Sequence, residues 1–322
     1  MQKDNFLYNK TNDYVLVSII MPIFNSPDVT ASIDSVLKQN YENIQFIILD
    51  DASYNFDCDK VRSYIDKNAR ENLYEIIIRQ NKKNIGTVRN MNQGFRLAKG
   101  KYIFSLAGDD VFYDEGVISD WVKEFEVTGA GLITAKRVRY DEMLSKEYGI
   151  EPSEEKINLI KHRTPMELFE DMCAYNFIFG CCTARSKSFI DEVGLFDEDY
   201  RLIDDYPMLL QYFRKGYSIH FFDRIVIKYR SGGISAERNY DKAYERDAKK
   251  ILKKEILPFT YDQNRARKEF KEWEKKQIKG KYRTLKNSPI QKIKIILYYV
   301  FHYPEDIGYL IKKYCIRGDK NC

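Results

Sequence analysis

The chain has 322 residues, of which 44% are apolar and 14% aromatic, so it is long enough to bury a large core and its composition excludes a disordered protein. Its net charge of +5 is unevenly distributed: residues 241–322 contain 22 of the 53 Lys and Arg residues but only 11 of the 48 Asp and Glu residues, which gives this region +11 and the rest −6. A basic region of this kind is typical of proteins that meet nucleic acid, anionic lipid or an acidic partner.

The targeting and cysteine patterns limit where the protein is expected to work. The first 13 residues are polar and lack the apolar stretch of a signal peptide, and the apolar run 295–301 is shorter than the roughly 20 residues of a membrane span. The six cysteines show no CxxC pair and no zinc-ligand spacing, and three histidines are too few for a multi-histidine metal site. We therefore expect a cytoplasmic protein with reduced thiols, soluble or peripheral on the inner face of the cell membrane.

Apolar periodicity in the first hundred residues predicts strands that alternate with helices. Nearly continuous apolar runs are typical of strands that are buried on both faces. The alternation predicts βαβ units and an α/β fold, with a mostly parallel sheet flanked by helices as in Rossmann-like proteins. The strands are expected at 15–24, 44–51, 74–80 and 101–107, and the helices at 30–40, 58–68 and 87–98.

The second half of the chain continues the alternation as far as about residue 237. The expected elements are a helix at 116–127, a strand at 131–140, a helix at 154–172 broken before Pro165, a strand end and helix at 181–194, a helix at 204–216 and one or two strands at 217–230. From 238 the chain is predicted to be helical and basic. We therefore expect an N-terminal tail (1–13), an α/β domain (14–237) and a basic helical C-terminal region (238–322).

Polar residues follow each of the first four predicted strands. In a parallel sheet these positions meet at one edge, outside the carboxyl ends of the strands, where ligands bind. We therefore expect the four segments to border one crevice. They read PIFN (22–25), DDAS (50–53), NKKNIGTVRN (81–90) and AGDD (107–110).

Two adjacent carboxylates, Asp109 and Asp110, follow the fourth strand directly. Mg²⁺ and Mn²⁺ prefer oxygen ligands from one or two carboxylates together with phosphate oxygens. Gly108 would leave room for a diphosphate beside them. A metal and diphosphate site is one interpretation of this segment, and a solvated cap of the helix at 116–127 is the other.

Five motifs in order resemble the family 2 glycosyltransferases, which have a GT-A fold. They are PIFN, LDDAS, NIGTVRN, LAGDD and GLFDEDYRLIDD, and the resemblance covers residues 15 to about 235. It implies an inverting, metal-dependent transfer of one sugar from a nucleotide-diphosphate sugar, expected to be a UDP-sugar, with Mn²⁺ or Mg²⁺ as cofactor. The acceptor is expected to be a hydroxyl of a glycan, lipid-linked or protein-linked molecule in bacterial surface polysaccharide or glycoconjugate synthesis.

The resemblance also implies roles for single residues. Asp51 would accept a hydrogen bond from the uracil N3–H, and Arg89 would lie near the base and diphosphate. Asp110 is our choice for the metal and Asp109 for the ribose, with Asp109 as a second possible metal ligand. The residues expected to line the base are Pro22, Ile23, Phe24 and Asn25.

A carboxylate base is expected at the start of the helix at 204–216. Inverting transfer needs a group that takes the proton of the acceptor hydroxyl. In the family this group is the second acid of a Glu-Asp pair, which makes Asp205 the base candidate and places Asp204 where the Glu would be. An Asp at a helix start is also a common cap without any catalytic role.

Two departures from the family pattern leave other interpretations open. Ala107 stands where the first Asp of an Asp-x-Asp-Asp motif is usual, and Gly232 stands where the loop YRSGGIS would carry a histidine ligand. A non-catalytic scaffold or binding module with a transferase-like fold is therefore the main alternative. A sugar nucleotidyltransferase is less favoured, because PIFNSPD is not the glycine-rich basic loop of that class.

The C-terminal region is expected to contact a partner. Residues 289–317 mix Ile, Leu, Tyr and Phe with Lys, and two short amphipathic helices separated near Pro304 would fit this pattern. Such helices can lie on a membrane surface, pack on the catalytic domain or pack against a second copy of the chain, and the sequence does not separate membrane contact from self-association. Nucleic acid is not expected as a partner, because no nucleic-acid-binding motif accompanies the charge.

Overall fold

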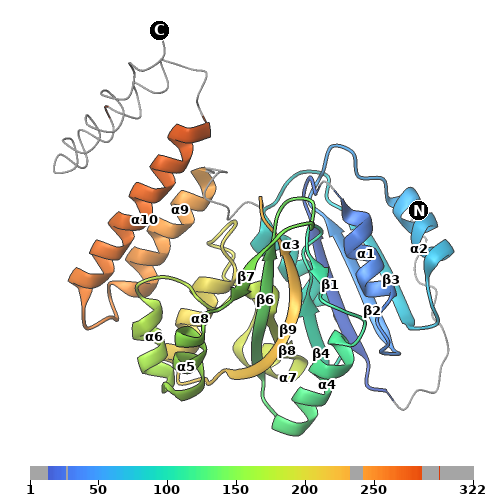
Figure 1. Ribbon diagram of the computed structural model, residues 1–322, viewed down its shortest axis with the longest axis horizontal. Coiled ribbons are helices and arrows are strands. Elements are labelled where there is room, and N and C mark those ends of the chain that lie inside the picture. Colours follow the sequence, from blue (N-terminus) through green and yellow to red (C-terminus); the bar gives the residue numbers. More distant parts are fainter. Residues whose placement is uncertain (1–13, 27, 233–241, 285–296, 298–322) are drawn as a thin grey trace.

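The computed structural model describes residues 14–26, 28–232, 242–284 and 297 (Figure 1). The N-terminal tail, the 237/238 domain boundary and, apart from Leu297, the amphipathic segment 289–317 lie outside these residues.

One nine-stranded sheet forms the centre of the protein. The first four strands in the order are parallel to one another, and beyond them β8 pairs antiparallel with both of its neighbours. β6 and β9 are again parallel, while β5 and β7 are short antiparallel additions. The order is β3 (Leu73–Gln80), β2 (Ile44–Asp50), β1 (Val17–Ile23), β4 (Tyr102–Ser105), β8 (Thr183–Ser186), β6 (Leu132–Tyr140), β9 (His220–Arg230) and β5 (Val111–Phe112), with β7 (Glu147–Glu151) beside β6.

The predicted α/β organisation is confirmed, with helices on both faces of the sheet. Successive residues of β1 point to opposite faces, so Ile19 and Met21 belong to one hydrophobic core and Ile20 belongs to the other. One core, the α1-side core, is covered by α1 (Val29–Leu37), α2 (Cys58–Asn68) and α4 (Val117–Thr128). The other, the α3-side core, is covered by α3 (Thr87–Leu97), α5 (Glu154–His162), α6 (Pro165–Met172), α7 (Lys187–Val193) and α8 (Asp205–Arg214).

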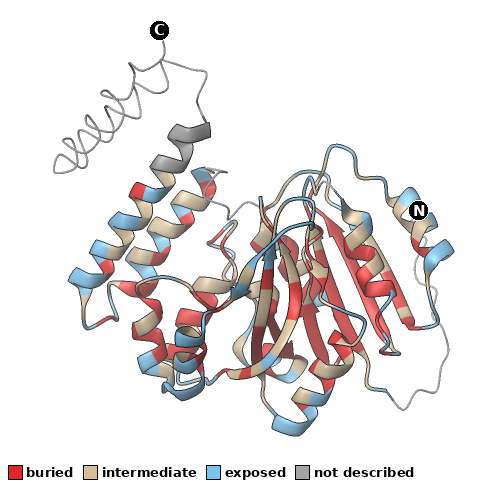
Figure 2. Cartoon of the chain, viewed as in Figure 1, coloured by how far each residue is buried: buried red, intermediate tan, exposed pale blue. Residues whose placement is uncertain are grey.

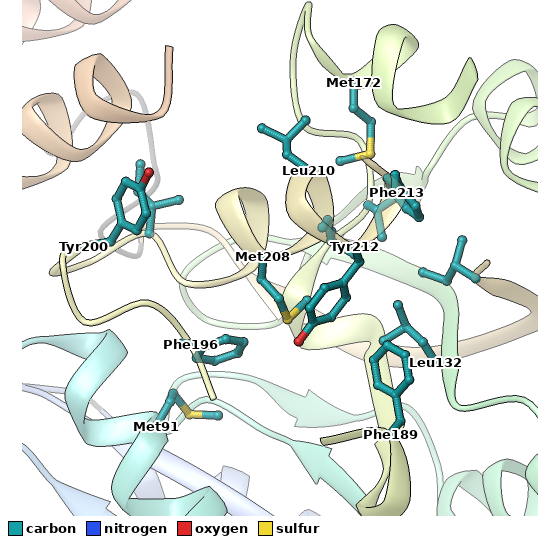
Figure 3. Packing of buried hydrophobic residues seen from close by; sticks show 14 of the residues in the cluster. Met91, Leu132, Met172, Phe189, Phe196, Tyr200, Met208, Leu210, Tyr212 and Phe213 are labelled. Atoms are coloured by element: carbon teal, nitrogen blue, oxygen red, sulfur yellow. The ribbon is translucent and has the colours of Figure 1, made fainter. Parts of the chain in front are cut away.

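Burial explains why the central strands are recognisable in the sequence. Every residue of β2 is buried, and Pro22 is the one residue of β1 that is not fully buried. Figure 2 shows the same contrast between buried strands and partly exposed helices. Figure 3 shows part of the α3-side core, where Met208 and Tyr212 of α8 lie near Phe196.

Several element boundaries differ from the sequence prediction for local reasons. The break before Pro165 is confirmed, because Thr164 forms a capping box with Glu167 and α6 begins at the proline. The fourth strand ends at Ser105, earlier than expected, and β5 and β7 were not predicted because short edge strands carry little periodicity. Residues 180–182 form a single 3₁₀ turn, η1 (Gly180–Cys182), before β8.

The described part of the C-terminal region packs against the α/β domain. It consists of α9 (Lys242–Ile251), a π-helical turn η2 (Leu252–Ile256) and α10 (Gln263–Thr284). Ile251 and Ile256 belong to the α3-side core, and Glu255 forms an ion pair of 2.8 Å with Arg214 of α8. The rings of Tyr244 and Trp273, 6.3 Å apart, connect α9 to α10, which lie side by side in Figure 1. Within the described ranges, no helix has both the length and the apolar character that a membrane crossing requires.

Candidate active site

The predicted site segments lie at the carboxyl ends of β1, β2, β3 and β4, as the parallel pairing of these strands requires. Backbone bonds connect them across the edge: Asp51 donates to the carbonyl of Ile23 at 2.8 Å, and Gly108 donates to that of Pro22 at 3.0 Å. A Cβ on Gly108 would lie 2.8 Å from Ile23, so the loop after β4 approaches β1 this closely only with glycine there.

Asp51 organises the loop after β3. Its Oδ1 accepts hydrogen bonds from the N–H of Ile85 at 2.8 Å and the side chain of Asn81 at 3.0 Å, and its Oδ2 accepts one from the N–H of Gly86 at 2.8 Å. Four lone-pair positions on the carboxylate thus receive three bonds, which leaves one acceptor position. Asp51 is 3% exposed, and its three bonds hold the loop after β3 against the end of β2.

Asp50 points to the other face of the same strand end. Its Oδ2 accepts bonds from the N–H of Ser53 at 2.9 Å and the side chain of Gln80 at 3.1 Å. Its Oδ1 is buried and has no hydrogen-bond partner among the described residues. A buried carboxylate oxygen without a partner is costly, so Asp50 is held at this strand end at an energetic penalty.

The loop after β1 is partly exposed, as a base-contacting segment would be. The Phe24 side chain is 42% exposed, whereas Ile23 is buried. Asn25 has a left-handed backbone (φ 51°), accepts a bond from the Tyr54 N–H at 3.2 Å and donates its own N–H to Ser53 at 2.7 Å. Arg89, by contrast, is exposed on α3 and lies 3.5 Å from Glu198. The structure therefore brings the β1 and β2 loops together but pairs Arg89 with a carboxylate.

The Asp109–Asp110 segment is fixed by the end of β9. The N–H of Arg230 donates to Asp110 Oδ1 at 3.0 Å, and the Arg230 Nε donates to the carbonyl of Asp109 at 2.8 Å. Burial raises the pKa of both carboxyls above the usual value, and for Asp110 the nearby Cys181 and Asp109 raise it further. Asp110 is buried and Asp109 is half-buried, and a bound cation would stabilise the ionised form of two adjacent carboxylates with raised pKa values.

The Asp204–Asp205 pair lies at the start of α8, as predicted. Asp205 Oδ2 accepts bonds from the N–H of Gly180 at 2.9 Å and the side chain of Asn176 at 3.3 Å, and its Oδ1 accepts one from the Tyr206 N–H at 2.7 Å. Asp204 Oδ1 accepts the N–H of Asp205 at 2.8 Å, so it also caps the helix. Burial, followed by the charge of Asp205, raises the pKa of Asp204 to about 7.

Cys181 interacts electrostatically with one residue of each acidic pair. Its thiol raises the pKa of Asp110, and the Asp205 charge acts on Cys181 in turn. Contact with Cys182, whose Sγ lies 3.8 Å away, and the Arg137 charge lower the pKa of Cys181 to about 7. Gly180, the residue before Cys181, also donates its N–H to Asp205, so Asp110 and Asp205, which are 95 positions apart in the sequence, both interact with the 3₁₀ turn 180–182.

Arg137 lies beside this turn. Its guanidinium lies 3.6 Å from the ring of Phe179 and 3.9 Å from the ring of Tyr229, donates twice to Glu151 and contacts the Cys181 sulfur at 3.6 Å. Stacking and ion pairing thus hold the positively charged guanidinium of Arg137 in place beside Cys181.

Sequence reasoning missed several residues that complete the site. They carry no motif of their own, because their roles depend on contacts between segments far apart in the chain. Two of them do lie in quoted segments, Asn81 in NKKNIGTVRN and Arg230 in YRSGGIS, but neither segment indicates the contact that the residue makes. The missed residues are Asn81, Arg137, Asn176, Gly180, Cys181 and Arg230.

The described residues contain no group of three or more His, Cys, Asp or Glu side chains placed to hold a metal ion by themselves. The donor set at Asp109 and Asp110 fits Mg²⁺ or Mn²⁺ in a different way. Both ions are bound in nucleotide sites by one or two carboxylates, with phosphate oxygens and water supplying the other ligands. The two carboxylates are hard oxygen donors that follow β4.

Residues 18–194, more than half of the chain, match the family model described as "Glycosyl transferase family 2". The chain belongs to glycosyl transferase family 2. An uncharacterized glycosyltransferase of Rickettsia prowazekii is 27% identical over 257 residues, covering 75% of this chain and 74% of that protein. The glycosyltransferase GlyG of Streptococcus pneumoniae is 23% identical over 250 residues, covering 75% of this chain and 79% of GlyG.

Solved structures show the same fold for this family 2 glycosyltransferase. Residues 1–349 of TarS from S. aureus, in complex with UDP, align with a TM-score of 0.56 and 16% identity over 92% of this chain and 83% of that one. The mannosyltransferase PcManGT from Pyrobaculum calidifontis, in complex with GDP-Man and Mn²⁺, aligns with a TM-score of 0.57 and 13% identity over 98% and 89%. The predicted GT-A fold and glycosyltransferase class are thereby confirmed.

Proposed function

We propose that this glycosyltransferase moves a single sugar, with inversion, from a UDP-sugar to a hydroxyl of a glycan, lipid-linked or protein-linked acceptor. The observation that carries the proposal is the placement of two acidic pairs: Asp109 and Asp110 follow β4 and are held by Arg230, and Asp205 begins α8 and is held by the Gly180 N–H. One pair suits the diphosphate end of a donor and the other suits an acceptor hydroxyl. Bacterial surface polysaccharide or glycoconjugate synthesis is the proposed setting.

The donor nucleotide is assigned to the ends of β1 and β2. Uracil N3–H is a hydrogen-bond donor, and the free acceptor position of the Asp51 carboxylate would receive this bond. The exposed ring of Phe24 offers a surface for stacking on the base, beside Pro22, Ile23 and Asn25. The UDP complex of TarS supports a uridine nucleotide, whereas the GDP-Man complex of PcManGT makes guanosine the competing choice.

A divalent cation, Mg²⁺ or Mn²⁺, is assigned to Asp110 with Asp109 as its neighbour or second ligand. When bound, such an ion would supply positive charge to the departing diphosphate. The chain's own contribution is to keep the two carboxylates in place, through the Arg230 N–H bond to Asp110 and the Arg230 side-chain bond to the Asp109 carbonyl. Asp109 is also the proposed ribose contact.

Asp205 is the proposed base. It takes the proton of the acceptor hydroxyl as the acceptor oxygen forms its bond to the anomeric carbon. The bond from that carbon to the diphosphate oxygen breaks, and the electron pair leaves with the diphosphate. Hydrogen bonds from Gly180, Asn176 and Tyr206 orient the carboxylate, so it is preorganised for this transfer.

Calorimetric titration with UDP, GDP and dTDP, each with Mn²⁺ and then with EDTA, tests the donor assignment. Selective, metal-dependent binding of UDP is the expected result. Tighter binding of GDP would overturn the uridine assignment but not the fold, and absence of binding to all three would overturn the donor site. Turnover is then measured as UDP released from a panel of UDP-sugars.

The basic C-terminal region is proposed to contact an anionic membrane surface. Helix α10 contains nine Lys or Arg residues and three Glu residues, an excess that would be attracted to anionic lipid. Cosedimentation of the full chain with vesicles should occur with phosphatidylglycerol and disappear with phosphatidylcholine alone. A chain that instead forms dimers and ignores both vesicles would identify this region as an oligomerisation surface.

A further inference from the structure

Helix α9 has a carboxylate in the middle of its buried face. Ala243, Asp247 and Ile251 are spaced by four residues and all are buried, so they form one stripe along the helix. Asp247 itself is only 4% exposed. An apolar residue would suit this stripe better, because a buried carboxylate is costly unless it is hydrogen-bonded.

The Asp247 carboxylate is satisfied by the segment directly before the catalytic pair. Its Oδ2 accepts the backbone N–H groups of Arg201 at 2.8 Å, Leu202 at 2.6 Å and Ile203 at 3.2 Å. Three consecutive amides therefore converge on one oxygen, and the next two residues in the chain are Asp204 and Asp205. Figure 3 shows Tyr200 just before this segment and Met208 just after it, on α8.

The same segment is fixed on its other side by the loop that Asp51 organises. The Arg201 carbonyl accepts the Val88 N–H at 3.1 Å, and the Arg201 side chain donates to the carbonyl of Asn84 at 3.1 Å. A Cβ on Gly86 would lie 2.6 Å from the Arg201 carbonyl oxygen, so the two backbones are in close contact. Residues 201–203 thus lie between the proposed nucleotide loop and α9.

We propose that Asp247 is a positioning residue for the glycosyl transfer, which it serves by fixing residues 201–203 so that Asp204 and Asp205 face the donor. The proposal rests on the proposed function, because it assigns catalysis to the pair at the start of α8. Helix α9 would then contribute to catalysis, in addition to any contact that the C-terminal region makes with a partner.

Attachment of the C-terminal region does not by itself require a carboxylate at this place. Glu255 already accepts bonds from Tyr200 at 2.9 Å and Gln211 at 3.1 Å and pairs with Arg214. Glu170 of α6 accepts bonds from Thr260 at 2.7 Å and Tyr261 at 3.1 Å. Asp247 differs from both in the target of its bonds, which is the backbone next to the base.

The test compares D247A and D247N with E170A. Because all three bonds go to one oxygen, D247N keeps an acceptor at that position and D247A does not. We expect D247A to lower kcat by about tenfold to a hundredfold, since small displacements of a catalytic group cost this much, with the Kd for UDP and Mn²⁺ within about twofold. D247N should keep kcat within about threefold of the wild type. E170A, which removes a comparable buried anchor of the C-terminal region, should lower the melting temperature and leave kcat within about twofold.

The proposal is overturned if folded D247A turns over at the wild-type rate, or if E170A loses as much kcat as D247A. If D247A does not fold, the test uses D247N. A large loss of kcat in D247N, with the amides of 201–203 still protected from hydrogen exchange, would contradict the positioning role of Asp247. Hydrogen exchange also separates the two proposals. If the wild type binds no UDP, the proposed function is wrong, but the 201–203 amides should still exchange faster in D247A than in the wild type. If their exchange is unchanged in D247A, only the role proposed for Asp247 is wrong.

Discussion

The backbone N–H of Gly180 donates to Asp205 Oδ2 at 2.9 Å, and a Cβ on Gly180 would lie 3.0 Å from both the Cβ and the Oδ2 of Asp205. The 3₁₀ turn therefore approaches the base so closely that any side chain there displaces it. We expect G180A to lower kcat by about tenfold to a hundredfold, because the carboxylate must shift relative to the acceptor. UDP binding should be unchanged, and steady-state kinetics together with calorimetry measure both quantities.

G116A is the control for the glycine substitution. Gly116 also lies at the start of a helix, but a Cβ there would meet its nearest atom, on Asp114, at 3.5 Å, an ordinary contact. Its kcat should match the wild type. A G180A enzyme with normal kcat would show that the base tolerates displacement, and would count against Asp205.

Asp204 and Asp205 should respond differently to amide substitution. D205N removes the proposed base and keeps an acceptor for only one of the two N–H groups, Gly180 or Tyr206, that bond to different oxygens of Asp205. We expect kcat to fall by about 10² to 10⁴ with little change in UDP affinity. D204N keeps the helix cap, and its loss should be far smaller. Single-turnover rates for the two variants make the comparison. A larger loss in D204N would transfer the role of base to Asp204.

The parallel strands and the two acidic pairs could be predicted because their signals are local. β2 is buried along its whole length, so its apolar run is unbroken, and each acidic pair follows a strand or begins a helix. The roles of Arg230 and Cys181 could not be predicted, since each depends on a contact with Asp110, which lies many residues away. Hydrophobic periodicity along the chain carries no information about such long-range interactions.

Asp247 shows the same limit within the C-terminal region. The excess of Lys and Arg there led to expectations about membranes and self-association, and charge counts do not reveal that one helix face enters the core. Four-residue spacing of Ala243, Asp247 and Ile251 places an acid on the buried stripe, but only the position of residues 201–203 explains it. Whether the segment beyond residue 284 meets a membrane stays a prediction.

D110N should weaken the metal-dependent part of nucleotide binding. The Asn side chain keeps an acceptor for the Arg230 N–H but loses the negative charge that a divalent ion requires. We expect the affinity for UDP with Mn²⁺ to fall by about tenfold or more, whereas the affinity in EDTA stays the same. D114N is the matched control, since Asp114 lies on the same segment and pairs with Arg224 at 2.8 Å. Equal losses in D110N and D114N would refute the assignment of the metal to Asp110.

Arg185 should set the pH at which the enzyme becomes active. Its side chain is buried, its Nε–H has no hydrogen-bond partner among the described residues, and it lies 5.8 Å and 5.3 Å from the rings of Phe95 and Phe196. Burial raises the pKa of both Asp204 and Asp205, and the Arg185 charge acts in the opposite direction on each. The other titratable groups that act on the pair or on Arg185 are Cys181, Tyr206, Tyr212 and Tyr244.

The base must be ionised, so kcat should rise with pH as Asp205 loses its proton, at a pH above the usual range of an aspartate because burial raises the pKa of Asp205. R185M removes the opposing positive charge, which raises the pKa values of the pair. We therefore expect the acid limb of the R185M profile to move to higher pH by about one unit, with kcat lowered on the acid side of the limb and restored on its alkaline side. R185K keeps the charge and should leave the limb near its wild-type position. A uniform loss of kcat at every pH in R185M would mean that Arg185 acts through packing, and that its charge does not govern the ionisation of Asp204 and Asp205.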